Sequence, residues 1–380
     1  MKNKLVFLFG IIGLAINSGA ATIYVDQSNT GGPWDGTTWA TAFTNIADAV
    51  TELGVTNAVV QGGHTIMVTN GTYNEQVIFT SAHAGTNGAY NVLEGVNYPI
   101  IDVEGARTNC IGLAQSQNFH VKGFRLTGAT MGYGRHDSGI LLYTIAGPEN
   151  YTVEDCYIYG NYQGISRERH DLSGIIITNC AIYRNTADGI VFDQSTFADI
   201  IDCAIIGNGQ NGYKGIDSGS TINIRNCVIA GNVYYGVYEV KATHVVTLNH
   251  CLVYKNGQGE YYDMTESAGA LRGATAINAL SDCANNIEGC PGYVNMVNFD
   301  PVLVYANSPL LGAGENGRDI GKQGVSTIPV SGNTYYVATT GSDAYTKEQA
   351  QNSGTPWQTI QHAADNMIAG DTVNVATGAY

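Results

Sequence analysis

IITNCAIYRN (residues 176–185), DIIDCAIIGN (199–208) and NIRNCVIAGN (223–232) are three copies of one pattern. Its cysteine recurs with separations of 24, 23, 24 and 24 residues, at Cys156, Cys180, Cys203, Cys227 and Cys251. An asparagine follows each cysteine by five residues, at Asn161, Asn185, Asn208, Asn232 and Asn256. Self-similarity at a fixed period of this size indicates a solenoid of stacked repeats.

The repeat predicts strands rather than helices. Apolar residues alternate around each cysteine, and no apolar run at helical spacing is long enough for three turns. Asparagine or aspartate stands before most of these cysteines, and such residues tolerate the left-handed backbone that a coil needs at its corners. We therefore predict an all-β solenoid with coils of about 24 residues.

Stacking places identical residues of successive coils in ladders, because neighbouring strands lie about 4.8 Å apart. The asparagines are then expected to hydrogen-bond along the stack, and the cysteines to form an inward apolar row of free thiols. Phe124 takes the cysteine position in an earlier coil. Cys283 and Cys290 flank the loop ANNIEG and are the better candidates for a disulfide, because a loop can adjust its geometry.

The N-terminus has the pattern of an export signal. Lys2 and Lys4 precede an apolar run from Leu5 to Ile16, and small residues lead to a cleavage position before Ala21. The run is too short to span a membrane. The formal net charge is −15, which makes nucleic acid an improbable partner. We therefore expect a secreted protein, at the cell surface or outside the cell, that has no membrane span.

The first and last segments resemble each other. Phe43, Ile46 and Ala49 correspond to Trp357, Ile360 and Ala363, in what we expect to be a short amphipathic helix that covers the end of a coil stack. The expected organisation is a signal peptide (1–20), an N-terminal cap with the first coils (21–110), a β-helix (111–325), and a linker with the truncated start of a second β-helix module (326–380). A further β-helix module of the same longer chain would then be a partner. The segment after residue 300 is expected to close the coil stack.

The opening segment IYVDQSNTGG…TAFTNIADAV, the GTY turn at 71–73 and the N-C-x-I-x-x-N coils resemble bacterial secreted right-handed parallel β-helix proteins of the pectin-lyase-like superfamily. The resemblance covers nearly all of residues 22–380 and implies a right-handed coil of three short parallel sheets. It does not fix the function, because that fold serves lyases, hydrolases, adhesins and passive scaffolds.

Enzymes of this superfamily usually bind a sugar chain in a groove along an outer face. Asp193, Asp217 and Glu239 each follow a Gly-Ile or Gly-Val pair on what look like successive coils, so we expect them in one outward row. Carboxylates roughly 5–10 Å apart suit acid/base glycoside hydrolysis or a shared Ca²⁺ ion. The alternative is a solvated acidic face. Apart from Ca²⁺, which is left open, no cofactor or set of metal ligands is indicated.

Two loops contain the triplet Arg-His-Asp, at Arg135-His136-Asp137 and at residues 169–171. We expect Arg169 and His170 to assist catalysis, since histidine moves protons near neutral pH and arginine pairs with a uronate carboxylate. The first triplet is expected to bind substrate together with Lys214 and Tyr238, one of several tyrosines along the coils. The alternatives are ion pairs within loops and tyrosine stacking without a ligand.

NTADGI at 185–190 differs by one inserted alanine from the NTDGI of the polygalacturonase family. NYQGI and NVYYGV occupy the same position in other coils, so the segment is interpreted as scaffold, with Asp193 after it left open. Two functional hypotheses follow. The favoured one is a secreted protein that binds extracellular polysaccharide or cell-surface glycan, with degradation by a lyase or hydrolase reaction undecided. The other is a non-catalytic, adhesin-type β-helix rod.

Overall fold

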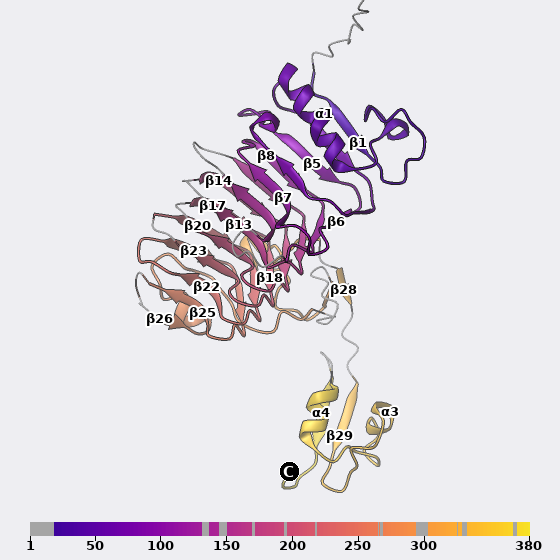
Figure 1. The fold of residues 1–380 in the computed structure, drawn as a ribbon. Coiled ribbons are helices and arrows are strands. Elements are labelled where there is room, and N and C mark those ends of the chain that lie inside the picture. Colours follow the sequence, from indigo (N-terminus) through magenta and orange to yellow (C-terminus); the bar gives the residue numbers. More distant parts are fainter. Residues whose placement is uncertain are drawn as a thin grey trace, which may run out of the picture.

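The computed structural model describes residues 19–130, 137–143, 150–168, 172–193, 196–216, 219–264, 266, 269–293, 303–324, 326–328, 333–367 and 371–380. Each repeat contributes one strand to each of three sheets, which are called A, B and C in chain order (Figure 1). Neighbouring coils pair in parallel, so the chain forms the predicted parallel β-helix. Among the described residues, no helix is both long enough and apolar enough to cross a membrane.

The strands are short, and their order along each sheet follows the chain. Sheet A consists of β1 (Thr22–Val25), β2 (Thr65–Val68), β5 (Asn91–Gly95), β8 (Phe119–Lys122), β11 (Tyr151–Glu154), β14 (Leu172–Thr178), β17 (Thr196–Ile201), β20 (Thr221–Arg225) and β23 (Val245–Asn249). Sheet B consists of β3 (Thr72–Tyr73), β6 (Ile100–Asp102), β9 (Arg125–Thr127), β12 (Tyr157–Tyr159), β15 (Ala181–Tyr183), β18 (Ala204–Ile206), β21 (Val228–Ala230) and β24 (Leu252–Tyr254). Sheet C consists of β4 (Val77–Phe79), β7 (Asn109–Ala114), β10 (Ser138–Tyr143), β13 (Gln163–Glu168), β16 (Ile190–Phe192), β19 (Tyr213–Gly215), β22 (Tyr235–Glu239), β25 (Gly259–Asp263) and the antiparallel β26 (Gly269–Leu271).

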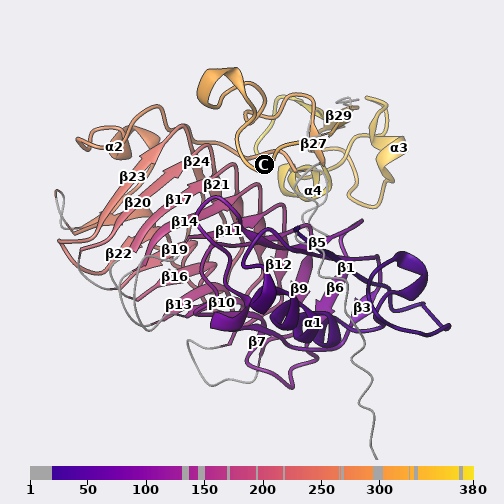
Figure 2. The same ribbon diagram turned by 90° about the horizontal axis from the view of Figure 1, so that it is seen from above.

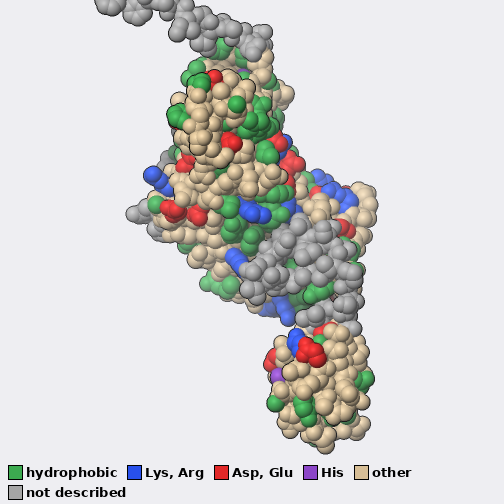
Figure 3. Space-filling model, turned by 90° about the vertical axis from the view of Figure 1, so that its right-hand side faces the viewer, with side chains coloured by type: hydrophobic (Ala, Val, Ile, Leu, Met, Phe, Trp, Pro, Cys, Tyr) green, Lys and Arg blue, Asp and Glu red, His purple; other side chains and the backbone are tan. Residues whose placement is uncertain are grey.

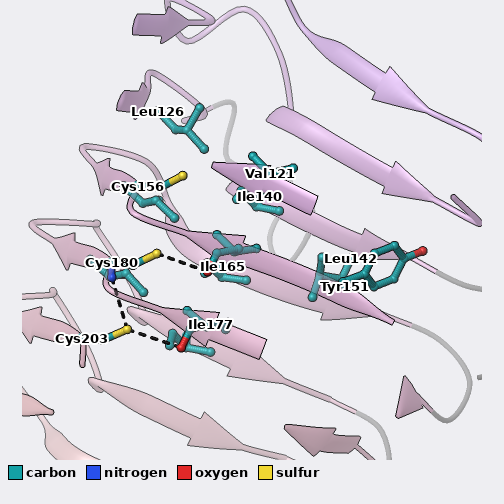
Figure 4. Packing of buried hydrophobic residues seen from close by; sticks show 14 of the residues in the cluster. Val121, Leu126, Ile140, Leu142, Tyr151, Cys156, Ile165, Ile177, Cys180 and Cys203 are labelled. Carbon is teal, nitrogen blue, oxygen red and sulfur yellow. Dashed lines mark hydrogen bonds between the residues drawn. The ribbon is translucent and has the colours of Figure 1, made fainter. Parts of the chain in front are cut away.

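The cysteine row lies inside the coils, as predicted. All five thiols of the repeat are fully buried and free. The backbone N–H of Cys180 donates to the sulfur of Cys203 at 3.4 Å (Figure 4). The same contact recurs in the next two coils. Phe124 is equally buried in its earlier coil. These rows are continuous with a core of Ile, Leu and Val side chains from all three sheets.

The asparagine ladder also forms. The side-chain amide of Asn185 donates to the side-chain oxygen of Asn208 at 3.0 Å, and equivalent bonds of 2.9–3.3 Å join the other members. At the corner between sheets A and B, the residue before each cysteine has a positive φ of 53–59°, as in Asn179 and Asn226. Asparagine and aspartate tolerate this conformation better than most residues, which explains their recurrence there.

Short helices cover both ends of the stack. At the first coil, α1 (Ile46–Val59) is capped by Asn45 and buries Ile46, Ala49, Val50 and Leu53 against the core (Figure 1). At the last coil, α2 (Ala274–Ile277) buries Ile277 in the same core. Cys283 also packs into this end, whereas Cys290 is exposed, and both thiols are free. The disulfide expected between them is therefore wrong, because one side chain faces the core and the other faces solvent.

Residues 303–324 lie along the side of the coils and not across their end, which corrects the expected closing segment. They begin with β27 (Leu303–Tyr305), which pairs with β28 (Ser326–Ile328), and they pack on the outside of sheet B (Figure 2). Leu310 and Ile320 cover Val228 and Leu252. Further along, the Lys322 ammonium donates to the carbonyl of Asn179 at 2.8 Å and pairs with Asp155. This segment therefore ties together coils that are far apart in the stack.

The last unit repeats the beginning of the chain. It contains β29 (Thr334–Val337), α3 (Lys347–Ala350), α4 (Ile360–Asn366) and β30 (Thr372–Val375), with β29 and β30 parallel. Val337 bridges to Trp357 just as Val25 bridges to Phe43. A side chain caps the helix that follows in each case, Thr359 for α4 and Asn45 for α1. Three 3-10 turns, Trp39–Thr41, Ser81–His83 and Glu315–Gly317, complete the helical elements of the described chain.

Candidate functional site

The expected outward row of three acids does not form. On sheet C, Phe192 is paired with Gly215 and Gly215 with Glu239, so Glu239 has an inward position. Its side chain is only 1% exposed. The repeat glycine of the middle coil is Gly212, which precedes Tyr213, and not Gly215. Asp193 and Glu239 therefore occupy different positions within their coils.

Glu239 is held inside the stack by three donors. Its carboxylate accepts from the Tyr261 hydroxyl at 2.7 Å, from the N–H of Val246 at 3.0 Å and from the N–H of Met264 at 3.3 Å. Burial is the main reason why the pKa of Glu239 is raised to about 8. A carboxyl group in this place cannot reach a polysaccharide on the outer surface, so the catalytic position expected for it is wrong.

The other predicted catalytic residues are placed only in part. Asp193 follows Phe192, is half-buried, and has Ile216 and Val240 at the equivalent positions of the next two coils. Asp217, Arg169 and His170 lie outside the described residues. The expected assembly of these groups into one catalytic set stays a prediction.

Of the two Arg-His-Asp triplets, only Asp137 is among the described residues. Arg135 and His136, which are outside the described residues, directly precede β10, whereas residues 169–171 follow β13. Asp137, which ends the first triplet, is fully buried at the start of β10. The burial of Asp137 contradicts its expected contact with substrate, and the roles expected for the other residues of the two triplets stay predictions.

Lys214 and Tyr238, both predicted to bind substrate, are direct neighbours on β19 and β22. Their side chains are half-buried and take outward positions of sheet C. The residues before and after them on each strand, Tyr213 and Gly215 on β19 and Val237 and Glu239 on β22, take inward positions. The structure thus brings these two side chains together on one outer face.

Three tyrosines form a cluster on that face. The ring centroids of Tyr235 and Tyr238 are 5.0 Å apart, and Tyr262 lies 5.2 Å from each of them. All three are half-buried, so their rings are partly accessible. We call Lys214, Tyr235, Tyr238, Tyr262 and the neighbouring Asp188 the tyrosine face.

Asp188 is the residue of this face that the sequence interpretation missed. One of its carboxylate oxygens accepts from the Asn211 side-chain amide at 2.7 Å and from the Asn211 N–H at 3.0 Å. The other lies 4.0 Å from the Lys214 ammonium. Asp188 is the aspartate of NTADGI. The segment is scaffold through Asn185, and the carboxylate of the buried Asp188, which is 2% exposed, lies next to Lys214 of the outer face. The repeat gave no signal for it, because the residue directly before the repeat glycine differs from coil to coil: Gln163, Asp188, Asn211 and Tyr235.

The tyrosine face combines groups that suit a sugar chain. Aromatic rings offer apolar planes and hydroxyl tips, and Lys214 offers a charged donor beside the buried carboxylate of Asp188. Among the residues that the structure describes, no group of three or more His, Cys, Asp or Glu side chains is placed to hold a metal ion. Asp217 is not among them, so the Ca²⁺ site stays a prediction. On the side of the molecule shown in Figure 3, charged side chains of both signs are scattered and do not gather in one patch.

Comparisons with known proteins agree with the fold. Residues 109–290 match the family model "Right handed beta helix region". The solved structure of pectate lyase Pel9A is similar, with a TM-score of 0.52 and 16% identity over 81% of this chain and 98% of that one. A pectin methylesterase from Aspergillus niger has a TM-score of 0.45 and 16% identity over 71% of this chain and 83% of its own. A comparison with curated proteins gave no match.

The fold and the family match define the class: the chain is a right-handed parallel β-helix protein. At 16% identity, the likeness to the pectate lyase shows the fold alone. What such a coil binds, and whether it acts on it, depends on the side chains of its faces.

Proposed function

We propose that this protein is exported and binds extracellular polysaccharide on the tyrosine face of sheet C. The observation that carries the proposal is the placement of Lys214 and Tyr238 side by side on adjacent strands, next to two further accessible tyrosine rings. Parallel strands repeat at about 4.8 Å, so an extended sugar chain lying along the stack meets similar side chains on several coils.

The pair of Lys214 and Asp188 favours a chain that carries some carboxylate. The ammonium attracts a uronate, while the buried Asp188 fixes the position of the ammonium at 4.0 Å. The similar fold of a pectate lyase supports the same class of ligand. Binding is the core of the proposal, and cleavage is a separate property that the same experiment measures.

A retention screen tests the proposal. The purified protein runs in native gels that contain pectin, alginate or a neutral glycan, and the same mixtures are assayed for unsaturated products and for new reducing ends, with and without Ca²⁺. We expect retardation by at least one uronate polymer, weakened in Lys214→Ala and unchanged in the control Tyr380→Ala, an exposed tyrosine of the last unit. Equal mobility in every uronate gel contradicts the proposal.

We further propose that the last unit receives another β-coil, as a second β-helix module would provide. Ile46 and Val68 are fully buried in the first unit, whereas their counterparts Ile360 and Val375 are each 46% exposed. In the first unit, β2 pairs with both β1 and β5, but in the described part of the last unit β30 pairs with β29 alone. The last unit thus has an uncovered face where the first has a core.

A chimera tests this second proposal. Residues 74–130 are appended directly after Tyr380, the counterpart of Tyr73, and Ile360→Ser is made with and without the extension. We expect the substitution to destabilise the last unit only in the extended chain. Hydrogen exchange of residues 334–376 measures this destabilisation. The same effect in both chains, or in neither, contradicts the proposal.

A further inference from the structure

A polar groove lies on the outer face of sheet A, away from the tyrosine face. Asp199, Asn223 and Thr247 are aligned across β17, β20 and β23, and Arg225 is aligned with Asn249 one step further along the strands. Together with His250 and Glu315 these side chains line a hollow of about 480 Å³. That volume is within the usual range of small-ligand sites.

One wall of this groove comes from the segment that returns along the coils. The N–H of Glu315 donates to the side-chain oxygen of Asn226 at 3.0 Å, and Arg318 pairs with Asp202 at 2.5 Å. The Glu315 carboxylate then lies 4.0 Å from the Arg225 guanidinium. The wall is therefore anchored to two coils of the stack, and the groove is part of the folded structure.

The floor of the groove is an oriented hydrogen-bond chain. The Thr247 hydroxyl donates to the side-chain oxygen of Asn223 at 3.0 Å, and the Asn223 amide donates to Asp199 at 3.0 Å. An amide NH₂ has two hydrogens and a carboxylate has two oxygens, so each group has capacity for a ligand beyond these bonds. Preorganised donors and acceptors of this kind lower the entropy cost of binding.

Apolar side chains continue the same face beyond the polar floor. Phe197 is 53% exposed and lies two residues before Asp199 on the same side of β17. Val245, which is 37% exposed, is aligned with Phe197 two strands away, on β23. Ile176, which is 38% exposed, is paired with Asp199. An exposed ring beside hydroxyl and amide groups offers a sugar both a stacking plane and partners for its hydroxyls.

We propose that this groove is a second carbohydrate site, specific for a neutral glycan chain. Asp199 and Glu315 outnumber the single guanidinium of Arg225 in the lining, so a uronate or phosphate would meet net repulsion. Sugar hydroxyls, by contrast, both donate and accept and match the mixed amide, carboxylate and hydroxyl floor. The site does not depend on the tyrosine face, because it lies on another sheet and selects a ligand of different charge.

Native gels that contain soluble neutral polysaccharides (β-glucan, arabinan and galactomannan) test the proposal. We expect at least one of them to retard the wild-type protein, and Asn223→Ala and Phe197→Ala each to weaken that binding by about tenfold, the loss of roughly one good contact. The control Thr152→Ala changes an outward residue of β11 that is aligned with Ile176 and Asp199 but lies further along sheet A. This substitution should leave binding intact.

The outcomes separate this site from the tyrosine face. If Tyr238→Ala removes neutral-glycan binding while Asn223→Ala does not, or if no neutral polysaccharide retards the wild type, the proposal is overturned. Loss of uronate binding in Lys214→Ala does not affect the proposal of a neutral-glycan site on sheet A. Unchanged thermal unfolding of the Asn223→Ala and Phe197→Ala variants shows that their lost binding is not lost folding.

Discussion

The carboxylate of Glu239 accepts a 2.7 Å hydrogen bond from the hydroxyl of Tyr261 in the interior of the coil stack. An acid in this place is protonated more readily than in the unfolded chain, because burial raises its pKa from 4.5 to about 8. Since the folded pKa is the higher one, the stabilising contribution of this group is complete below about pH 4.5 and is lost as the pH rises through about 8.

The first prediction is therefore a pH dependence that belongs to Glu239. Between about pH 4.5 and about 8, its contribution to the free energy of unfolding should fall with a slope of up to ~1.4 kcal/mol per pH unit. Urea unfolding of the wild type and of Glu239→Gln at several pH values measures the slope. Gln cannot titrate, so the difference between the two proteins should change across this window. Parallel curves would show that Glu239 does not carry the effect.

Removing a member of the asparagine ladder should destabilise the β-helix. Asn208→Ala deletes donors to Asn232 and to the carbonyl of Ile182, and it leaves the backbone and side-chain donors of Asn185 without their acceptor. Buried unsatisfied groups cost about 1–3 kcal/mol each, so a loss of at least ~3 kcal/mol is expected. Asn223→Ala, on the exposed face, is the matched control and should cost less than about 0.5 kcal/mol. Equal losses for the two variants, measured by chemical denaturation, would argue against a structural ladder.

A charge in the inward apolar row should prevent folding. Ile182 is fully buried between Ile158 and Ile205 of the neighbouring coils, so Ile182→Asp places an unpaired carboxylate in the core. We expect no soluble folded protein from this variant. Ile182→Val removes one methylene at the same position and should fold with a loss of about 1 kcal/mol. Normal expression and a normal melting curve for Ile182→Asp would contradict the coil register.

Thiol reactivity should distinguish Cys290 from the rest. The native protein is expected to react quickly at Cys290, the exposed thiol, and slowly at the seven buried ones. Denaturation without reductant should release all eight cysteines of the chain. Cys290→Ser should abolish the fast phase. If only six thiols react after denaturation, two of the eight cysteines are held in a disulfide bond and the prediction is wrong.

The sequence was sufficient for the coil but not for the site. Residues such as Cys203 and Asn208 recur because every coil must satisfy the same packing and hydrogen-bond requirements, so their spacing predicts the ladders directly. Outer residues are not constrained in that way. The coil of Cys203 contains two candidate repeat glycines, Gly212 and Gly215, and aligning the repeat on the wrong one reverses the expected side-chain direction in that coil. Glu239 stands three residues after Gly236, as the inward Phe192 does after Gly189.

The tyrosine face could be predicted only in part for the same reason. Tyr238 and Lys214 are 24 residues apart, one coil length, so their contact follows from the repeat. Asp188 lies in a segment whose asparagine and glycine serve the scaffold, and its bond to Asn211 depends on coil geometry. The groove on sheet A was not predicted, since its wall at Glu315 comes from a segment that returns along the coils.

The most direct test of the central claim is a calorimetric titration of uronate oligosaccharide into the wild type and into Tyr238→Ala. The tyrosine face predicts that loss of this ring raises Kd by about tenfold, corresponding to ~1.4 kcal/mol, while thermal unfolding stays the same. Binding by Tyr238→Ala that equals the wild type would place the polysaccharide elsewhere on the molecule and contradict the account.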